Sequence, residues 1–260
     1  MFNRGIVIYA FNSTFDYVKS AAFAARQAKK YLGLPVTLIT NNPADIEDFD
    51  NVVVITNEEK SDRQYRDAVG EVTTIDWFNK SRTLAYQHSP YNQTLLIDAD
   101  YFMFNDSLKV MFDTDTNFAC FDKINDVMGI ERDLVKLSDI SIPMQWATVI
   151  YFTKNSFAEA VFTFMEKIKA DWEYYSMLYS FSSSAFRNDF ALSIALQALS
   201  GYSTKNFSCL PGKLHTIFSS TNVVDVDNTK VIVNKNTELS YVINTNIHCM
   251  NKMDLNKFYA

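Results

Sequence analysis

Several features are scarce or missing, and each absence argues against a class of protein. The 260-residue chain has three cysteines, Cys120, Cys209 and Cys249, which are far apart and form no CxxC pair. An odd number of widely spaced cysteines argues against a disulfide framework and fits a reducing compartment. The longest apolar runs fall short of the roughly 18 to 20 residues that a bilayer crossing needs. The N-terminus leads straight into a strand-like run without a signal-peptide pattern, so we expect a cytoplasmic protein with no membrane span.

Common nucleotide-binding and hydrolase motifs are also absent. The chain has no GxGxxG, no Walker phosphate loop and no GxSxG elbow. The segment from Asp113 to Asn117 begins like a calcium loop, but Phe118 stands where glycine is needed. The cysteines and histidines lack the spacing of a zinc site. A net charge of −6 disfavours a general binder of phosphate backbones, although a local basic groove remains compatible with it.

The apolar runs that are present alternate with helical patterns. We expect strands at Ile6–Phe11, Pro35–Thr40, Val52–Ile55, Thr116–Phe121 and Ala147–Phe152, and one ending at Asp98. We expect helices from Ser13 or Thr14 to about Leu32, Thr74–Ser89, Ser156 to about Asp171 behind a capping box with Glu159, and Asn188–Leu199, with an exposed loop at Asn57–Gly70. This order predicts an α/β fold with a mostly parallel, Rossmann-like central sheet flanked by helices. Without a linker or repeat, residues 1–260 are expected to form a single domain with a nucleotide-binding half, 1–105, and an acceptor half, 106–260, that ends in a metal-ligand segment.

The most informative stretch is Thr94–Asp100, TLLIDAD, where an apolar run is followed at once by two aspartates. Around a strand end, positions i and i+2 point the same way, so Asp98 and Asp100 are expected to aim their carboxylates together. Two such carboxylates repel unless a cation lies between them, and oxygen ligands suit Mg²⁺ or Mn²⁺. A cation held there would grip a diphosphate. A solvated acidic turn is the alternative, because the same spacing recurs away from apolar strands at Asp48/Asp50, Asp113/Asp115 and Asp225/Asp227.

Further polar residues follow neighbouring strands. In parallel α/β sheets, ligands bind beyond the carboxyl ends of the strands, so these segments are expected to meet. The residues expected to bind the nucleotide sugar are Tyr9, Ala10, Phe11, Asn12, Asn41, Lys80, Arg82, Ala99 and Gln145. The asparagines have ordinary turn chemistry as an alternative role. For Lys80 and Arg82 the alternative is a solvated helix face.

Three residues in the second half complete the expected site. His248 follows a strand-like run and offers an imidazole as a third ligand beside the carboxylates. Lys252 could neutralise a leaving diphosphate. Asp189 opens a helix and is expected to act catalytically, beside the reacting carbon or the acceptor hydroxyl. A structural histidine and a helix N-cap are the alternatives for His248 and Asp189.

Taken together, these motifs resemble the glycosyltransferases of the GT-A fold, and specifically glycosyltransferase family 8, the group of glycogenin and bacterial galactosyltransferases. The matching motifs, at low density over most of the chain, are Tyr9–Asn12, the Lys80 helix, Leu95–Asp100, Pro143–Phe152, Asn188-Asp189, and His248 with Lys252. Two motifs depart from the family. His248 to Lys252 is shorter than the usual HxxGxxK, and Gln145-Trp146-Ala147 replaces the usual Asn-x-Gly. The chain also resembles glycosyltransferases of large tailed bacteriophages, which would place it in the host cytoplasm.

The resemblance implies a ligand set and a reaction. Asp98, Asp100 and His248 would hold Mn²⁺, or Mg²⁺, against the diphosphate of a nucleotide-sugar donor such as a UDP-sugar. A hexosyl or pentosyl group would then pass to an acceptor hydroxyl on a glycan, a protein or a modified nucleic acid base, with retention at the anomeric carbon. Lys252 would stabilise the leaving diphosphate. If the enzyme inverts instead, Asp189 becomes the candidate general base.

Competing functions are weaker matches. A haloacid-dehalogenase-like phosphatase also places DxD after an apolar strand, but Phe102 stands where it needs Thr or Val. A sugar-nucleotide pyrophosphorylase needs a Gly-rich N-terminal loop, where this chain has Phe11–Thr14. A non-catalytic nucleotide-sugar binding protein remains an alternative. So does a glycosyltransferase that modifies phage DNA bases, which a basic groove would favour and the net acidity mildly opposes.

Overall fold

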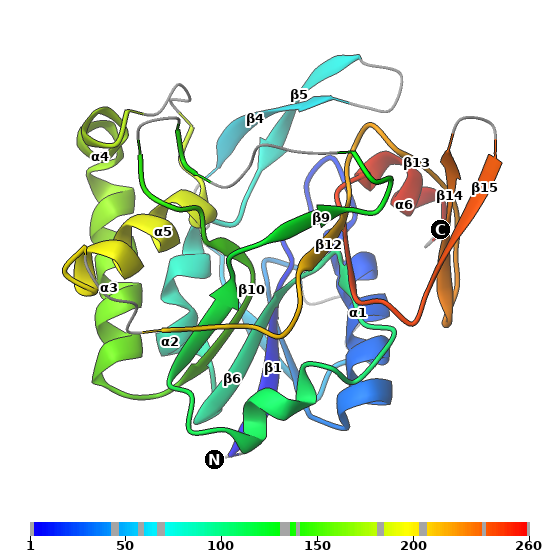
Figure 1. Ribbon diagram of the computed structural model, residues 1–260. Coiled ribbons are helices and arrows are strands. Elements are labelled where there is room, and N and C mark those ends of the chain that lie inside the picture. Colours follow the sequence, from blue (N-terminus) through cyan, green and yellow to red (C-terminus); the bar gives the residue numbers. More distant parts are fainter. Residues whose placement is uncertain are drawn as a thin grey trace.

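The fold is built on a seven-stranded sheet in the order β11-β8-β10-β6-β1-β2-β3 (Figure 1). The computed structural model describes residues 3–42, 47–56, 60–66, 71–130, 136–138, 141–180, 185–202, 207–235 and 238–258. Within these ranges, no helix combines the length and apolar character that a bilayer crossing requires. The strands of the central sheet are β1 (Arg4–Tyr9), β2 (Val36–Thr40), β3 (Asn51–Val54), β6 (Gln93–Asp98), β8 (Phe118–Phe121), β10 (Trp146–Thr153) and β11 (Ser208–Cys209).

Most neighbours in this sheet are parallel. β1 pairs in parallel with β2 and β6, and β2 pairs in parallel with β3. β10 runs antiparallel to both β6 and β8. The expected α/β architecture with a mostly parallel central sheet flanked by helices is therefore confirmed, and the carboxyl ends of β1, β2 and β6 meet at one edge.

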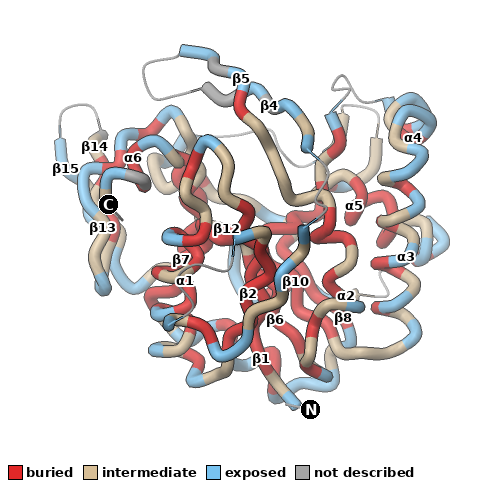
Figure 2. Tube along the Cα trace, turned by 180° about the vertical axis from the view of Figure 1, so that it is seen from behind, coloured by how far each residue is buried: buried red, intermediate tan, exposed pale blue. Residues whose placement is uncertain are grey.

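Helices cover both faces of the sheet because its strands are apolar on both sides. Along β1, Ile6 and Ile8 belong to the core on the side of α1 (Tyr17–Leu32), while Val7 and Tyr9 belong to the core under α3 (Ser156–Ala170) and α5 (Asn188–Leu199). The central strands are buried over almost their whole length (Figure 2). Near-continuous apolar strands thus reflect burial on both faces.

A smaller sheet places the C-terminal segment beside the central one. Its strands, in the order β7-β16-β12-β9, are β7 (Tyr101–Phe102), β16 (Ile247–Cys249), β12 (Leu214–Ile217) and β9 (Ile124–Asp126). β7 begins just after β6, so pairing with β7 carries β16 to the carboxyl end of β6. The remaining elements are η2 (Lys109–Asp113), α4 (Trp172–Leu178), β13 (Asn222–Val226), β14 (Lys230–Lys235), β15 (Glu238–Ile243) and α6 (Lys252–Phe258).

The region before the acidic pair differs from the sequence prediction. A hairpin of β4 (Ser61–Arg66) and β5 (Val72–Trp77) stands where an exposed loop and the start of a helix were expected; residues 57–59 and 67–70 lie outside the described residues. Helical structure begins only at η1 (Lys80–Leu84) and continues as α2 (Ala85–His88). VTTIDW is rich in β-branched and aromatic residues, which favour a strand. Asn79, with φ of 146°, separates the strand from the helical turn.

Two helix starts also differ from expectation by a few residues. α1 begins at Tyr17, and the Asp16 side chain, rather than Ser13 or Thr14, accepts a hydrogen bond from Lys19 N. α3 is capped by Asn155, whose Oδ1 accepts from Ala158 N at 2.9 Å, and not by a capping box from Ser156. In both cases a neighbouring Asp or Asn supplies the same acceptor chemistry. The helix end at Gly33 is confirmed, with φ of 68° and its N–H bonded to Lys29 O.

Candidate functional site

A cavity of about 210 Å³ opens at the carboxyl end of β1 and β6. One wall is formed by the acidic segment after β6 and by the C-terminal residues His248, Met250 and Lys252. Residues at the start of β10, at the start of α5 and in the β4–β5 hairpin also line the cavity. Segments distant in sequence therefore meet at the edge where ligands of such sheets bind.

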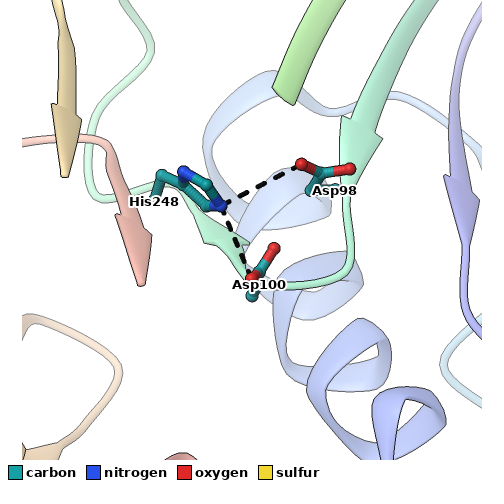
Figure 3. A group of neighbouring side chains, drawn as sticks. All are labelled: Asp98, Asp100 and His248. Carbon is teal, nitrogen blue, oxygen red and sulfur yellow. Dashed lines mark ion pairs between the residues drawn. The ribbon is translucent and has the colours of Figure 1, made fainter. Parts of the chain in front are cut away.

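The structure brings Asp98, Asp100 and His248 together (Figure 3). β16 pairs with β7 so that His248 lies opposite Tyr101, the residue after Asp100. His248 Nε2 is 3.5 Å from Asp100 Oδ2 and 4.0 Å from Asp98 Oδ2. One ligand atom from each residue lies within 4.8 Å of the others. Short-range turn geometry thus supplies two of the three candidate ligand side chains, and strand pairing supplies the third.

The donor set fits a divalent cation of the Mn²⁺ or Mg²⁺ type. Two carboxylates and one imidazole combine hard oxygen ligands with a borderline nitrogen ligand. The adjacent Cys249 is fully buried, and burial raises the pKa of its thiol to about 12. Its sulfur is not among the candidate ligand atoms of the cluster, which come from Asp98, Asp100 and His248.

Each carboxylate of the pair also has a cationic side chain beside it. Asp98 Oδ1 pairs with Arg82 Nη1 at 3.0 Å, and Asp100 Oδ2 contacts Lys252 Nζ. Lys252 Nζ also donates to Cys249 O at 3.0 Å. These contacts counter the like-charge repulsion of two neighbouring carboxylates.

The two basic residues expected from the segment before β6 lie in different places. Arg82 lines the cavity but is 2% exposed, and its guanidinium donates to Ile97 O, Ala147 O and Thr148 O. It is buried inside the protein and does not lie on a solvated helix face. Lys80 does not belong to the cavity lining; its carbonyl accepts hydrogen bonds from Thr83 Oγ1 and Lys169 Nζ.

The residues after β1 and β2 divide between the cavity and the turn. Tyr9 and Phe11 line the cavity, and the Tyr9 hydroxyl is 2.9 Å from His88 Nδ1. Ala10 is 1% exposed and donates its N–H to Ile39 O. Asn12 Oδ1 accepts from Val18 N at 2.9 Å, and Asn41 Oδ1 accepts from Asn12 N at 3.3 Å. The two asparagines thus make turn contacts, the alternative that the sequence left open for them.

The remaining expected residues also differ in position. Ala99 and Asp189 line the cavity. Gln145 is 3% exposed and lies outside the lining, with its N–H bonded to Ser193 Oγ at 2.7 Å. Its neighbour Trp146 does line the cavity.

Sequence reasoning missed the contribution of the hairpin and of the segment that follows it. Trp77, Phe78 and Asn79 line the cavity, and Gln64 and Ile75 join them from the two hairpin strands. The β-branched run after residue 71 was the signal that could have revealed β5. A helix was expected there because the spacing of Trp77, Leu84 and His88 also fits a helical face.

No family model and no curated protein matches the sequence. Among solved structures, the chain is similar to the glycosyltransferase GlyE of Streptococcus pneumoniae TIGR4, with 11% identity and a TM-score of 0.42 over 81% of this chain and 46% of GlyE. It is also similar to the galactosyltransferase LgtC in complex with donor and acceptor sugar analogs, with 14% identity and a TM-score of 0.44 over 79% of this chain and 72% of LgtC. The chain thus spans about half the length of GlyE. At these identities and TM-scores the likeness says nothing of activity.

Proposed function

We propose that this chain is a metal-dependent glycosyltransferase of the GT-A type, which transfers a hexosyl or pentosyl group from a nucleoside-diphosphate sugar to an acceptor hydroxyl. The observation that supports this most is the cluster of Asp98, Asp100 and His248 with Lys252 beside it, at the carboxyl edge of a mostly parallel sheet and in a cavity. Two carboxylates and an imidazole suit a cation, and an ammonium group suits the anion that such a cation would carry.

Asp98, Asp100 and His248 would hold Mn²⁺ or Mg²⁺, which supplies positive charge to the leaving diphosphate when bound. The Lys252 ammonium, beside Asp100, stabilises the same developing charge. Tyr9 and Phe11 offer aromatic faces at the end of β1, where we place the nucleoside, with a UDP-sugar as the proposed donor. Residues 1–105 would then hold the nucleotide, and the start of α5 in 106–260 would face the acceptor.

Retention at the anomeric carbon is proposed on the family resemblance alone. Asp189 lies in the cavity wall and is the only residue proposed here as a base, should the enzyme invert. The anomeric configuration of the product, read by proton NMR from the coupling constant of its anomeric hydrogen, decides between the two.

A thermal-shift screen of nucleoside-diphosphate sugars with and without Mn²⁺ tests the proposal. Ligand at about 100 times its dissociation constant stabilises the folded state by about 2.7 kcal/mol, which a melting curve resolves. We expect the shift to need both sugar nucleotide and Mn²⁺, and to vanish in Asp100→Ala. Asp225→Ala is the matched control, because Asp225 has the same aspartate spacing in exposed β13. Equal shifts without Mn²⁺ would contradict a cation-dependent site.

A further inference from the structure

Residue Ala147, at the start of β10, lies where the pairing of β10 with both neighbouring strands is interrupted. The pairing of β10 with β8 shifts register between Trp146 and Ile150, and its pairing with β6 begins only at Val149. Neither register includes Ala147, which is 3% exposed. Its N–H and C=O therefore need partners other than the strand ladder, because buried backbone groups are costly to leave unpaired.

Two charged side chains from different elements supply those partners. Arg82 Nη2, from η1, donates to Ala147 O at 2.7 Å and to Thr148 O at 3.3 Å. Asp189 Oδ1, from the first turn of α5, accepts from Ala147 N at 2.9 Å. Both backbone polar groups of one residue, in the two peptide groups on either side of its Cα, are thus bonded by charged side chains. We call Arg82, Ala147 and Asp189 the Ala147 junction.

The junction reaches the proposed cation site through Arg82. Arg82 Nη1 donates to Ile97 O at 3.2 Å and pairs with Asp98 Oδ1 at 3.0 Å. The guanidinium therefore joins the end of β6 to the start of β10 and contacts one oxygen of Asp98. A planar fork with several donors is required for this, which a lysine ammonium cannot reproduce.

Asp189 and its neighbours connect the junction to the start of α5. Asp189 Oδ2 pairs with Arg187 Nη2 at 2.7 Å, so both carboxylate oxygens of Asp189 have partners. Asn188 Nδ2 donates to Asn79 O at 3.0 Å, which joins the start of α5 to the segment that leads into η1. These hydrogen bonds and ion pairs connect three elements, η1, β10 and α5, beside the cavity.

We infer that Arg82 and Asp189 are positioning residues, which bond the C=O and the N–H of Ala147 respectively and thereby fix Asp98 relative to the start of α5. This rests on the proposed function, and it revises the role of Asp189. Its Oδ1 serves as a hydrogen-bond acceptor for a backbone N–H, and its Oδ2 is held by Arg187. Asp189 acts on the site through Ala147 and Arg82, without exchanging a proton or attacking the sugar.

The first test measures Mn²⁺ affinity of the ligand-free protein by electron paramagnetic resonance of free Mn²⁺. Asp189→Asn keeps an acceptor oxygen for Ala147 N, so we expect affinity within about twofold of the wild type. Asp189→Ala removes it, and we expect a loss of about 3- to 10-fold, at or below the roughly 10- to 100-fold loss that follows when a direct hydrogen-bond partner of a metal ligand is removed. Asp171→Ala, at the start of α4, is the control that should change nothing. Equal losses in Asn and Ala variants, or none in either, would overturn the inference.

The second test uses turnover of the sugar nucleotide. A positioning role predicts that Asp189→Asn keeps kcat within about tenfold and leaves the acidic limb of the pH profile in place. If Asn and Ala variants both lose kcat by about a thousandfold or more, Asp189 is a catalytic group and the inference is wrong.

A third measurement separates failure of this inference from failure of the proposed function. Arg82→Met and Asp189→Ala, alone and combined, are compared by urea unfolding without metal or nucleotide. If the two residues belong to one network, the loss of unfolding free energy in the double variant differs from the sum of the losses in the two single variants. If they are independent, the double variant shows that sum. A wild type that fails to bind Mn²⁺ defeats the proposed function but leaves this cycle intact. Strict additivity defeats the junction, whatever the reaction.

Discussion

The ends of β1 and β6 lie side by side and both carry polar residues, yet they use them differently. Tyr9 and Asp98 are partners in the sheet register. After β6, the carboxylates of Asp98 and Asp100 face the cavity with His248 between them. After β1, the Asn12 side chain accepts a hydrogen bond from Val18 N and does not line the cavity.

The difference follows from what each chain segment must do next. β6 leads within a short turn into β7, and the backbone of that turn is bonded by β16, through Cys249 N to Asp100 O at 2.9 Å. β1 leads into α1, whose first N–H groups have no acceptor within the helix. Asn12 and Asp16 supply acceptors to Val18 and Lys19. A polar side chain after a strand can bind a ligand only where it is not already used as a hydrogen-bond acceptor for backbone N–H groups.

The largest effect is expected at the end of β6. Asp100→Ala removes a proposed ligand that is 6% exposed, so that only His248 and Asp98 would be left to hold the cation. We expect Mn²⁺ affinity to fall by at least about 100-fold, beyond the roughly 10- to 100-fold range of outer-shell losses. Isothermal titration with Mn²⁺ measures this, with Asp225→Ala in β13 as the matched control. Affinity within a few-fold of wild type would remove Asp100 from the site.

The next largest effect on Mn²⁺ affinity is expected at His248, which the pairing of β16 with β7 brings to the site. His248→Ala leaves both carboxylates in place, so we expect Mn²⁺ affinity to fall about 10- to 100-fold, less than for Asp100. His215→Ala, on neighbouring β12, is the control because it lies outside the cavity lining. If the His248 and His215 variants bind Mn²⁺ equally well, His248 is structural.

A smaller effect, on nucleotide affinity, is expected from the Lys252 ammonium beside the carboxylates. Lys252→Met removes the ammonium that contacts Asp100, and we expect the affinity for a nucleoside diphosphate with Mn²⁺ to fall about tenfold, the range of one charge-assisted hydrogen bond of about 1.5 kcal/mol. Lys257→Met, on the same helix and paired with Asp254 at 2.6 Å, is the control. Equal nucleotide affinity in both variants would show that Lys252 does not meet the diphosphate.

The same contrast explains how much could be predicted from sequence. Apolar runs predicted the strands of the parallel half, because burial on both faces leaves an unmistakable pattern. Asp98 and Asp100 were found because they directly follow such a run. The hairpin wall with Trp77 was missed, since its spacing fits a helix as well as a strand. The partners of Arg82 and Asp189 could not be foreseen, because they depend on a register shift in β10 that no local pattern records.

The smallest effect on ligand affinity is expected at the end of β1, where we expect a substitution to change stability instead. Asn12→Ala removes the acceptor for Val18 N near the start of α1, so we expect a loss of about 1 kcal/mol of unfolding free energy, as for other helix-start acceptors. Nucleotide and Mn²⁺ affinities should stay within about twofold, because the side chain does not reach the cavity. Urea unfolding and isothermal titration on the same preparation measure both. Asp100→Ala should differ in its ligand affinity, with a large loss of Mn²⁺ binding, because it removes a proposed ligand of the cation. If Asn12→Ala weakened nucleotide binding tenfold at unchanged stability, the end of β1 would bind ligand directly and the contrast between the two strand ends would collapse.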